Sequence, residues 1–133
     1  IRNLYFGFDK KSLLIRCDTA SRAKDDLQPG QELRIRFLEP DGHEVRVKVF
    51  EAGALELTLF RGGTPEKSVA VAAVGDVAVV SIPLADLGLT AGQGIHFYAE
   101  LFEARNSLDR IPSEGMIELT VPAEDFDIRN WQV

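Results

Sequence analysis

A row of aromatic and polar side chains in the second half of the chain has the composition of a sugar-binding surface. Alternation over residues 95–102 places His96, Tyr98, Glu100 and Phe102 on one side of an extended segment. An aromatic ring can pack against the C–H groups of a pyranose while polar neighbours bind its hydroxyl groups. The row therefore predicts a carbohydrate-binding surface, and the alternative is that Tyr98 and Phe102 cover a neighbouring loop.

The only tryptophan, Trp131, is a further candidate for contact with a sugar. Its ring is the largest stacking surface among the amino acids. A tryptophan close to a chain end can also pin the terminus to the domain, so both roles are open. The predicted carbohydrate-binding residues are His96, Tyr98, Glu100 and Trp131.

Residues suited to catalysis are present, but they lack the spacing that catalysis requires. The two histidines, His43 and His96, have no nucleophile motif around them, and a nucleophile needs a base within hydrogen-bonding reach. The sequence has no glycine-rich phosphate loop, no pair of Cys-x-x-Cys motifs, no His-Glu-x-x-His and no Gly-x-Ser-x-Gly. We therefore predict no catalytic residues here, and an independent enzyme is kept only as a third hypothesis.

Four aspartates near the first predicted loops are the candidates for a cation site. They are Asp9, Asp18, Asp25 and Asp26. Calcium requires roughly 6–8 oxygen ligands at about 2.5 Å, and these acids do not have the spacing of a dedicated calcium loop. We predict no metal site and no cofactor, with calcium as the alternative to a solvated acidic rim.

The charge balance argues against nucleic acid as a partner. The chain has 21 acidic and 15 basic residues, a net charge of -6, and no cluster of five or more basic residues interrupts that balance. Such a surface repels phosphate backbones on average. No apolar run approaches the ~20 residues of a membrane helix. We predict a soluble protein that binds neither nucleic acid nor membrane.

Cysteine usage gives a weak indication of the compartment. The single cysteine, Cys17, excludes an intrachain disulfide and favours a reducing compartment, so the predicted location is cytoplasmic. We interpret Cys17 as a small buried strand residue. The chain begins at Ile1 and its only methionine is Met116, from which we expect a piece of a longer protein.

The elements that must position these side chains are short strands, because period-two alternation dominates the sequence. Residues 4–8 and 13–17 alternate in this way and predict a hairpin around residues 9–11. The segment 83–88, with proline near its start and glycine at its end, predicts a single helical turn. We predict one domain, residues 1–133, with an all-β fold: an antiparallel β-sandwich of about nine strands with one short helical turn.

The central hairpins permit a prediction of register. The apolar residues of strands 33–37 and 45–49 share a face if Glu39 pairs with His43 around a three-residue loop. The glycine at the third position of that loop suits the left-handed conformation required there. A second loop of the same kind adds strand 55–59 to the same inner face.

That register brings like charges together on the outer face. It places Arg36 opposite Arg46 and Arg34 opposite Lys48, an arrangement disfavoured by repulsion. Glu56 on the next strand compensates in part. The face is interpreted either as an anion-binding or domain-docking surface, or as a solvated sheet surface with salt bridges.

A hairpin over residues 69–82 is apolar on both faces. A two-residue turn at Gly75 and Asp76 pairs Val74 with Val77. Because one face packs on the core, the other must also be covered. Our hypothesis is that another domain or subunit covers it, and the alternative is a loop of this domain. The predicted interface residues are Ala70, Ala72, Val74, Val77 and Val79.

Several segments resemble a known family. They are residues 4–9 (Leu-Tyr-Phe-Gly-Phe-Asp), residues 13–18 (Leu-Leu-Ile-Arg-Cys-Asp), residues 82–89, Arg110-Ile111-Pro112, Gly115, Val121-Pro122, Asp125-Phe126 and Trp131. Together they resemble the C-terminal β-sandwich attached to glycoside hydrolase family 57 enzymes, the amylase and glucanotransferase group. That domain is similar in shape to family 9 carbohydrate-binding modules, and the similarity spans nearly the whole chain.

The resemblance implies an accessory domain beside an α-glucan-acting barrel whose catalytic carboxylates lie upstream of Ile1. Family 9 modules hold a sugar between two tryptophans, whereas this sequence has only Trp131, so that clamp does not transfer. The expected function is non-catalytic: the domain stabilises or orients an upstream catalytic domain of the same chain. The alternative is a carbohydrate-binding module for α-glucans that uses the row around Tyr98.

Overall fold

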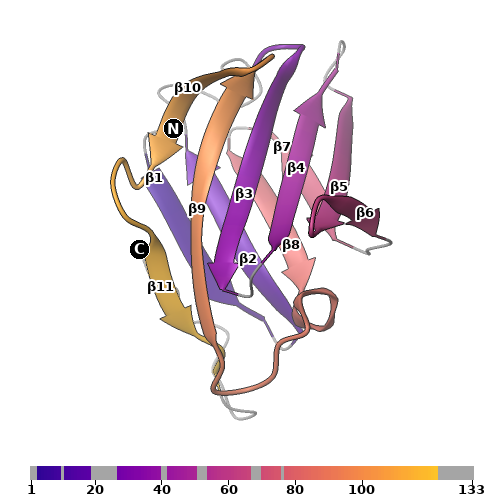
Figure 1. Ribbon diagram of the computed structural model, residues 1–133. Helices are drawn as coiled ribbons and strands as arrows, with labels where there is room; N and C mark the ends of the chain where they lie inside the picture. Colours follow the sequence, from indigo (N-terminus) through magenta and orange to yellow (C-terminus); the bar gives the residue numbers. More distant parts are fainter. Residues whose placement is uncertain are drawn as a thin grey trace.

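The chain folds into two antiparallel β-sheets that face each other, as Figure 1 shows. The computed structural model describes residues 3–9, 11–18, 27–39, 42–50, 54–66, 70–75 and 77–122. Within these ranges there are eleven strands and one turn of 3-10 helix. The predicted all-β sandwich is confirmed, with two strands more than the expected count.

The smaller sheet has four strands in the order β1-β2-β8-β7. Its strands are β1 (Asn3–Phe8), β2 (Ser12–Asp18), β7 (Val71–Val74) and β8 (Ala78–Pro83). The predicted β1–β2 hairpin is confirmed, with Phe6 opposite Ile15. Asp9 closes it, because its Oδ1 accepts hydrogen bonds from the backbone N–H groups of Lys11 (2.8 Å) and Ser12 (2.7 Å).

The larger sheet has seven strands in the order β10-β9-β3-β4-β5-β6, with β11 also paired to β9. Its strands are β3 (Gln31–Glu39), β4 (His43–Val49), β5 (Leu55–Arg61), β6 (Thr64–Glu66), β9 (Gly94–Glu103), β10 (Asn106–Ile111) and β11 (Ile117–Thr120). β3 occupies one edge of β9. β10 and β11 lie end to end along the other edge.

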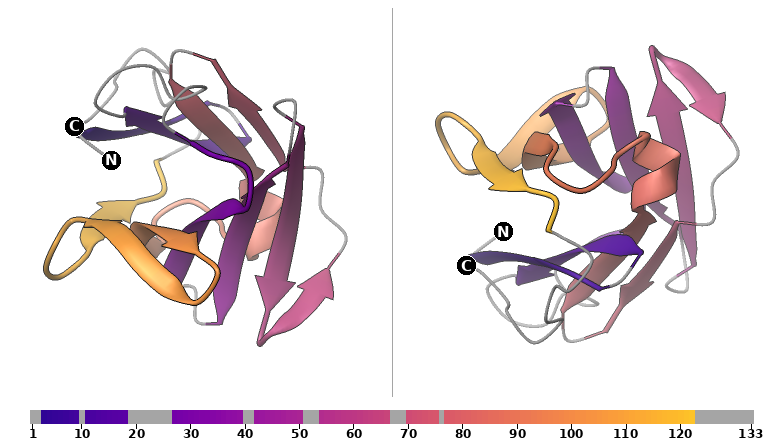
Figure 2. Two further views of the ribbon diagram at one scale, coloured as in Figure 1. Left: turned by 90° about the horizontal axis from the view of Figure 1, so that it is seen from above. Right: turned by 90° about the horizontal axis from the view of Figure 1, so that it is seen from below.

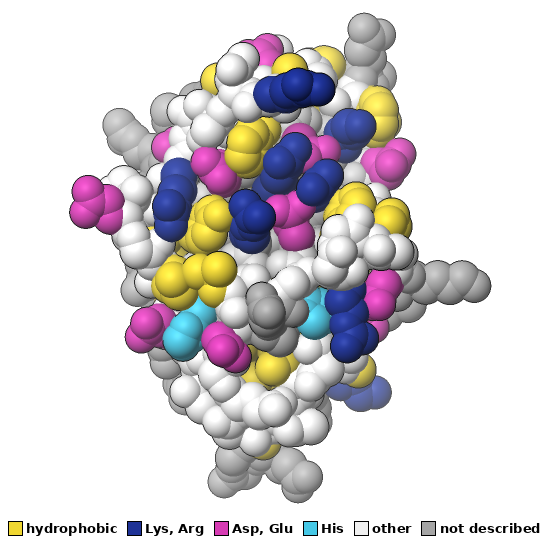
Figure 3. Space-filling model, viewed as in Figure 1, with side chains coloured by type: hydrophobic (Ala, Val, Ile, Leu, Met, Phe, Trp, Pro, Cys, Tyr) yellow, Lys and Arg dark blue, Asp and Glu magenta, His cyan; other side chains and the backbone are white. Residues whose placement is uncertain are grey.

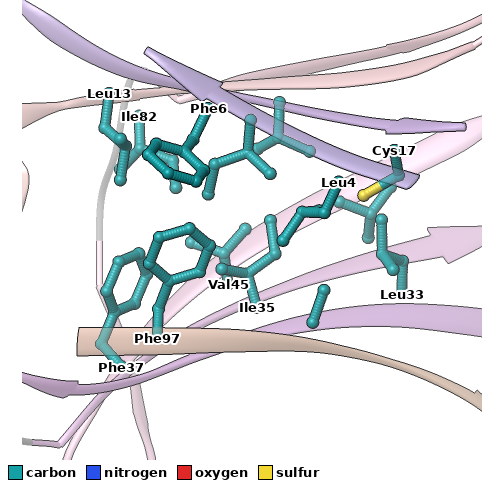
Figure 4. Close-up of a cluster of buried hydrophobic side chains, with 14 of the residues drawn as sticks. Leu4, Phe6, Leu13, Cys17, Leu33, Ile35, Phe37, Val45, Ile82 and Phe97 are labelled. Atoms are coloured by element: carbon teal, nitrogen blue, oxygen red, sulfur yellow. The ribbon is translucent and has the colours of Figure 1, made fainter. Parts of the chain in front are cut away.

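The core lies between the inward faces of the two sheets, which Figure 2 shows end on. The alternation in the sequence places every second side chain of each central strand in this layer. Phe97 of β9 is fully buried and its ring lies 5.8 Å from that of Phe37 and 6.3 Å from that of Phe6 across the sandwich (Figure 4). Burying one such ring contributes roughly 1.5–3 kcal/mol.

The predicted helical turn is confirmed at Leu84–Leu87, at the lower end of the sandwich in Figure 1. It ends at Gly88, whose φ of +67° is the left-handed conformation that glycine adopts without strain. Leu87 is buried and joins the core. None of the described residues forms an apolar helix of membrane-spanning length.

The predicted register of the β3–β4 hairpin is wrong by two residues. Glu39 does not pair with His43, and Arg36 does not pair with Arg46. The observed pairs are Arg36 with Glu44, Arg34 with Arg46 and Glu32 with Lys48. A shift of two preserves which residues face the core, so the apolar pattern tolerates both registers. The observed one brings opposite charges together at two of these three positions, which stabilises the pairing.

The predicted register of the β7–β8 hairpin is wrong by one residue. Val74 pairs with Ala78 rather than with Val77. A shift of one exchanges the two faces of β7. As a result Ala70, Ala72 and Val74 pack against the core, whereas Val71 and Ala73 point outward and are exposed.

Candidate functional site

The outer surface of the larger sheet is covered with alternating charged and aromatic side chains, and we call it the charged face. Figure 3 shows basic, acidic and apolar groups interleaved across it. It consists of charged and aromatic outward residues of five strands: Glu32, Arg34, Arg36, Glu44, Arg46, Lys48, Glu56, Phe60, His96, Tyr98, Glu100, Phe102 and Arg110.

Three arginines of the charged face lie over three of its rings. The pairs are Arg34 over Phe102 at 4.1 Å, Arg46 over Phe60 at 4.4 Å and Arg110 over Tyr98 at 4.0 Å, measured from the guanidinium carbon to the ring centroid. Each such contact contributes about 0.5–1 kcal/mol. One face of each ring is therefore occupied by a guanidinium and is closed to a stacking ligand.

Two carboxylates of the charged face are held by two of the same arginines. Glu32 accepts a hydrogen bond from Nε of Arg34, and Glu44 accepts one from Nε of Arg46. Glu44 also lies 3.7 Å from Nε of Arg36 on the neighbouring strand. Because Glu44 is buried, its charge depends on these two arginines for compensation.

The structure brings three of the four predicted sugar-binding residues to one surface. His96, Tyr98 and Glu100 are half-buried and point outward in a row along β9. Tyr98 lies opposite Arg36, and Glu100 accepts a hydrogen bond of 2.6 Å from Oγ of Ser107. Trp131, the fourth predicted residue, lies outside the described residues.

Arg110 is one residue of this surface that the alternation pattern did not predict. Besides covering Tyr98, it donates a hydrogen bond to the backbone carbonyl of Gly115. Its Nε is buried without a hydrogen-bond partner in the part of the chain that is described. β10 has only two apolar residues and a bulge between Ser107 and Asp109, so periodicity gave no signal for the strand.

A hollow of about 250 Å³ opens at one end of the charged face, where the β3–β4 and β5–β6 hairpins meet. We call it the hairpin hollow. Its wall includes Arg36, Leu38, Glu44, Arg46, Phe60 and the turn Gly62–Gly63. The backbone N–H of Gly62 donates a 2.8 Å hydrogen bond to the carbonyl of Gly42, which ties the two hairpins together.

The outer surface of the smaller sheet has a different composition. On β7 and β8 its outward residues are Val71, Ala73, Val79 and Ser81, and we call these four the apolar face. Val71 is 62% exposed. Of the five predicted interface residues, only Val79 lies on this face, because Val77 lies in the turn before β8 and the other three face the core.

The titratable residues that have clear contacts on β2 and in the first hairpin are part of the scaffold. Burial raises the pKa of Cys17 to about 12, which keeps the thiol neutral. A hydrogen bond with Asp18 raises the pKa of Arg16. Asp9 caps the first hairpin, while Asp25 and Asp26 lie outside the described residues. No group of three or more metal-binding side chains occurs within the described ranges.

Comparisons of the chain with protein-family models, with curated proteins and with solved structures found no match. The resemblance to the C-terminal domain of family 57 glycoside hydrolases therefore stays a prediction from the sequence motifs.

Proposed function

We propose that this chain is a non-catalytic accessory domain of an α-glucan-acting glycoside hydrolase, and that it stabilises or orients the catalytic domain by docking it against the apolar face. The single observation behind the docking surface is the outward row of β7 and β8. The resemblance of the sequence motifs implies what would dock there, namely an upstream catalytic domain of the same chain.

The composition of the apolar face supports this role. Its four residues are uncharged, although the exposed Arg16 of β2 lies beside Val79. Val71, with 62% of its surface exposed, is the most exposed large apolar residue among those described. A single exposed valine is common on protein surfaces. Here it adjoins exposed Ala73 and half-buried Val79, and contiguous apolar surface of this kind is typical of contacts with another protein unit.

The experiment introduces a charge at the docking surface of the longer protein that this proposal requires. We expect Val71→Lys to lower the melting temperature of the catalytic domain, because docking would desolvate the ammonium group. Leu108→Lys is the matched control, since Leu108 is 48% exposed on the opposite sheet. Equal melting temperatures for the two variants would contradict docking at this face, and a longer protein without α-glucan activity would contradict the assignment to a glycoside hydrolase.

A second candidate is a carbohydrate-binding module for α-glucans, favoured by the row of His96, Tyr98 and Glu100 on one surface. Against it, Arg110 occupies one face of the Tyr98 ring. Titrating the domain with maltooligosaccharides while following the NMR signals of Tyr98 distinguishes the two functions. Saturable shifts at Tyr98 that disappear in Tyr98→Ala would favour the binding module, and unchanged spectra at millimolar ligand would exclude it.

A further inference from the structure

The hairpin hollow contains more positive charge than its own acid compensates. Arg36 and Arg46 both contribute to the wall, and Glu44 is the acid between them. Glu44 forms its hydrogen bond with Arg46, whose guanidinium also lies over the Phe60 ring. These contacts hold Arg46 in place. The charge of the Glu44 carboxylate is therefore compensated chiefly by Arg46.

Arg36 is the less engaged of the two arginines. Its Nε is 3.7 Å from Glu44, longer than an N–H···O hydrogen bond, and 60% of its side chain is exposed. A guanidinium has five N–H donors in a planar fork that matches the two oxygens of a carboxylate. Within the described ranges Arg36 makes no side-chain hydrogen bond, so it can bind an incoming carboxylate without giving one up.

The rest of the wall fits a small ring with hydroxyl groups. Leu38, 44% exposed, and Phe60 offer apolar surface at the hollow, and the second oxygen of Glu44 can accept a hydrogen bond from a hydroxyl group. A volume of about 250 Å³ is below the ~300 Å³ at which sites for drug-sized ligands begin. The hollow therefore suits a single sugar ring better than an extended chain.

Three glycines shape this wall. A Cβ on Gly42 would lie 3.4 Å from the backbone nitrogen of Gly62, and the φ of Gly42 is +77°. A side chain at Gly42 would thus be strained by the positive φ, and its Cβ would contact the Gly62 backbone. Gly62 and Gly63, with φ of +59° and +81°, form a two-residue turn of the kind that needs positive φ at both positions.

We propose that the hairpin hollow binds a monosaccharide with a carboxylate group, a uronate, through Arg36. The carboxylate pairs with the guanidinium of Arg36, the hydroxyl groups reach Glu44, and the C–H groups pack on Leu38 and Phe60. A monoanion is favoured over a phosphate dianion because Glu44 repels the second negative charge. This binding is independent of the proposed docking at the apolar face, which lies on the other sheet.

The test is an NMR titration of the isotopically labelled domain with glucuronate, glucose, acetate and inorganic phosphate. The backbone amides of Gly42, Gly62 and Gly63 report on the hollow. We expect glucuronate to shift them saturably and to bind about tenfold to a hundredfold more tightly than glucose, which lacks the charge-assisted hydrogen bonds. Acetate and phosphate should bind more weakly than glucuronate because they lack the ring.

Variants identify the groups involved. Arg36→Gln should weaken glucuronate binding by about tenfold or more, and Leu38→Ser should weaken glucuronate but leave acetate unchanged. Arg105→Gln is the matched control, because Arg105 is exposed in the turn after β9, at the opposite end of β3 from the hollow. Unshifted amides elsewhere in the spectrum show that each variant is folded.

Three results would overturn the proposal. The first is equal affinity for glucuronate and glucose, which would show that the carboxylate of the ligand does not contribute to binding. The second is equal affinity for glucuronate, acetate and phosphate, which would make the hollow a site for simple anions only. The third is unchanged glucuronate binding in Arg36→Gln.

Discussion

The charged face and the apolar face are built on inner faces of the same kind, yet their outward side chains differ. On the smaller sheet, contacts of the kind seen on the charged face occur on β1 and β2, where Arg16 lies over Tyr5 and pairs with Asp18. On the charged face the side chains contact one another: Arg46, for example, contacts both Glu44 and Phe60. On the apolar face Val71 and Ala73 extend into solvent. Side chains that hydrogen-bond and stack on one another stabilise the domain itself, whereas exposed apolar side chains remain available for contact with a second unit. The comparison suggests separate roles for the two faces.

The largest effect that separates the faces is expected at Glu44. Glu44→Gln removes the negative charge between Arg36 and Arg46 and should reduce the free energy of unfolding by about 1.5–3 kcal/mol, the range for hydrogen bonds to charged groups. Urea denaturation measures this change. The control is Glu56→Gln, an exposed acid opposite Lys48, where we expect less than about 1 kcal/mol. Equal losses of unfolding free energy in Glu44→Gln and Glu56→Gln would show that the burial of Glu44 does not increase its contribution to stability.

The next effect concerns Cys17, in the layer beneath the apolar face. Its pKa is raised from 9.0 to about 12 by burial, so above about pH 9 the unfolded thiol ionises while the folded one stays neutral, and stability falls as pH rises. Between about pH 8 and about pH 10 this group should cost ~1.4 kcal/mol. Cys17→Ala should lack that part of the pH dependence in urea denaturation. Identical pH profiles for the two proteins would mean that the thiol ionises equally in both states.

A smaller effect tests whether the arginine–ring contacts on the charged face are energetically coupled. A double-mutant cycle with Arg34→Ala and Phe102→Ala should give a coupling energy of about 0.5–1 kcal/mol, the value of a cation–π contact near the surface. The same cycle with Arg105→Ala in place of Arg34→Ala should give no coupling. If the stability losses of Arg34→Ala and Phe102→Ala simply add, the contact between these two side chains contributes no stabilisation.

The smallest effect is expected on the apolar face. In the isolated domain Val71→Thr removes little buried apolar surface, because Val71 is 62% exposed, and it should change the free energy of unfolding by less than about 0.5 kcal/mol. Thermal denaturation of the isolated domain checks this. A loss above about 1 kcal/mol would show that the domain itself uses this residue, and would weaken the contrast between the two faces.

Alternation in the sequence was sufficient to predict which residues face the core in the long strands. Leu33 and Ile35 of β3, Val45 and Val47 of β4, and Phe97 of β9 are all buried as expected. The physical reason is that one polar and one apolar face leave a strand only one favourable orientation. The all-β sandwich and the outward row of His96, Tyr98 and Glu100 could be predicted for the same reason.

The pairing register of neighbouring strands was harder to predict, because different registers can bury the same apolar residues. In β3 and β4 a shift of two leaves the faces unchanged, so only the charges distinguish Arg36 opposite Glu44 from Arg36 opposite Arg46. In β7 all four residues are valine or alanine, and both orientations look equally apolar. The predicted interface therefore included Ala72 and Val74, which face the core.

The candidate site was predictable only in part. The row on β9 follows from alternation, but the hairpin hollow depends on how two hairpins approach each other through Gly42 and Gly62. The contact of Arg110 with Tyr98 requires β10 to lie beside β9, and the composition of β10 gave no indication of a strand. Long-range pairing of this kind is decided by the packing of the whole domain.

The way β10 and β11 share one edge of β9 affects how this protein behaves at high concentration. A long strand with free backbone groups is a template for ordered aggregation. β9 has ten residues, but its outer edge is covered by two separate short strands. At the opposite end of that sheet β6 has three residues, and its central residue, Pro65, has no N–H to donate. The larger sheet therefore offers little uninterrupted edge to which further copies could add, which should disfavour fibril growth through this sheet.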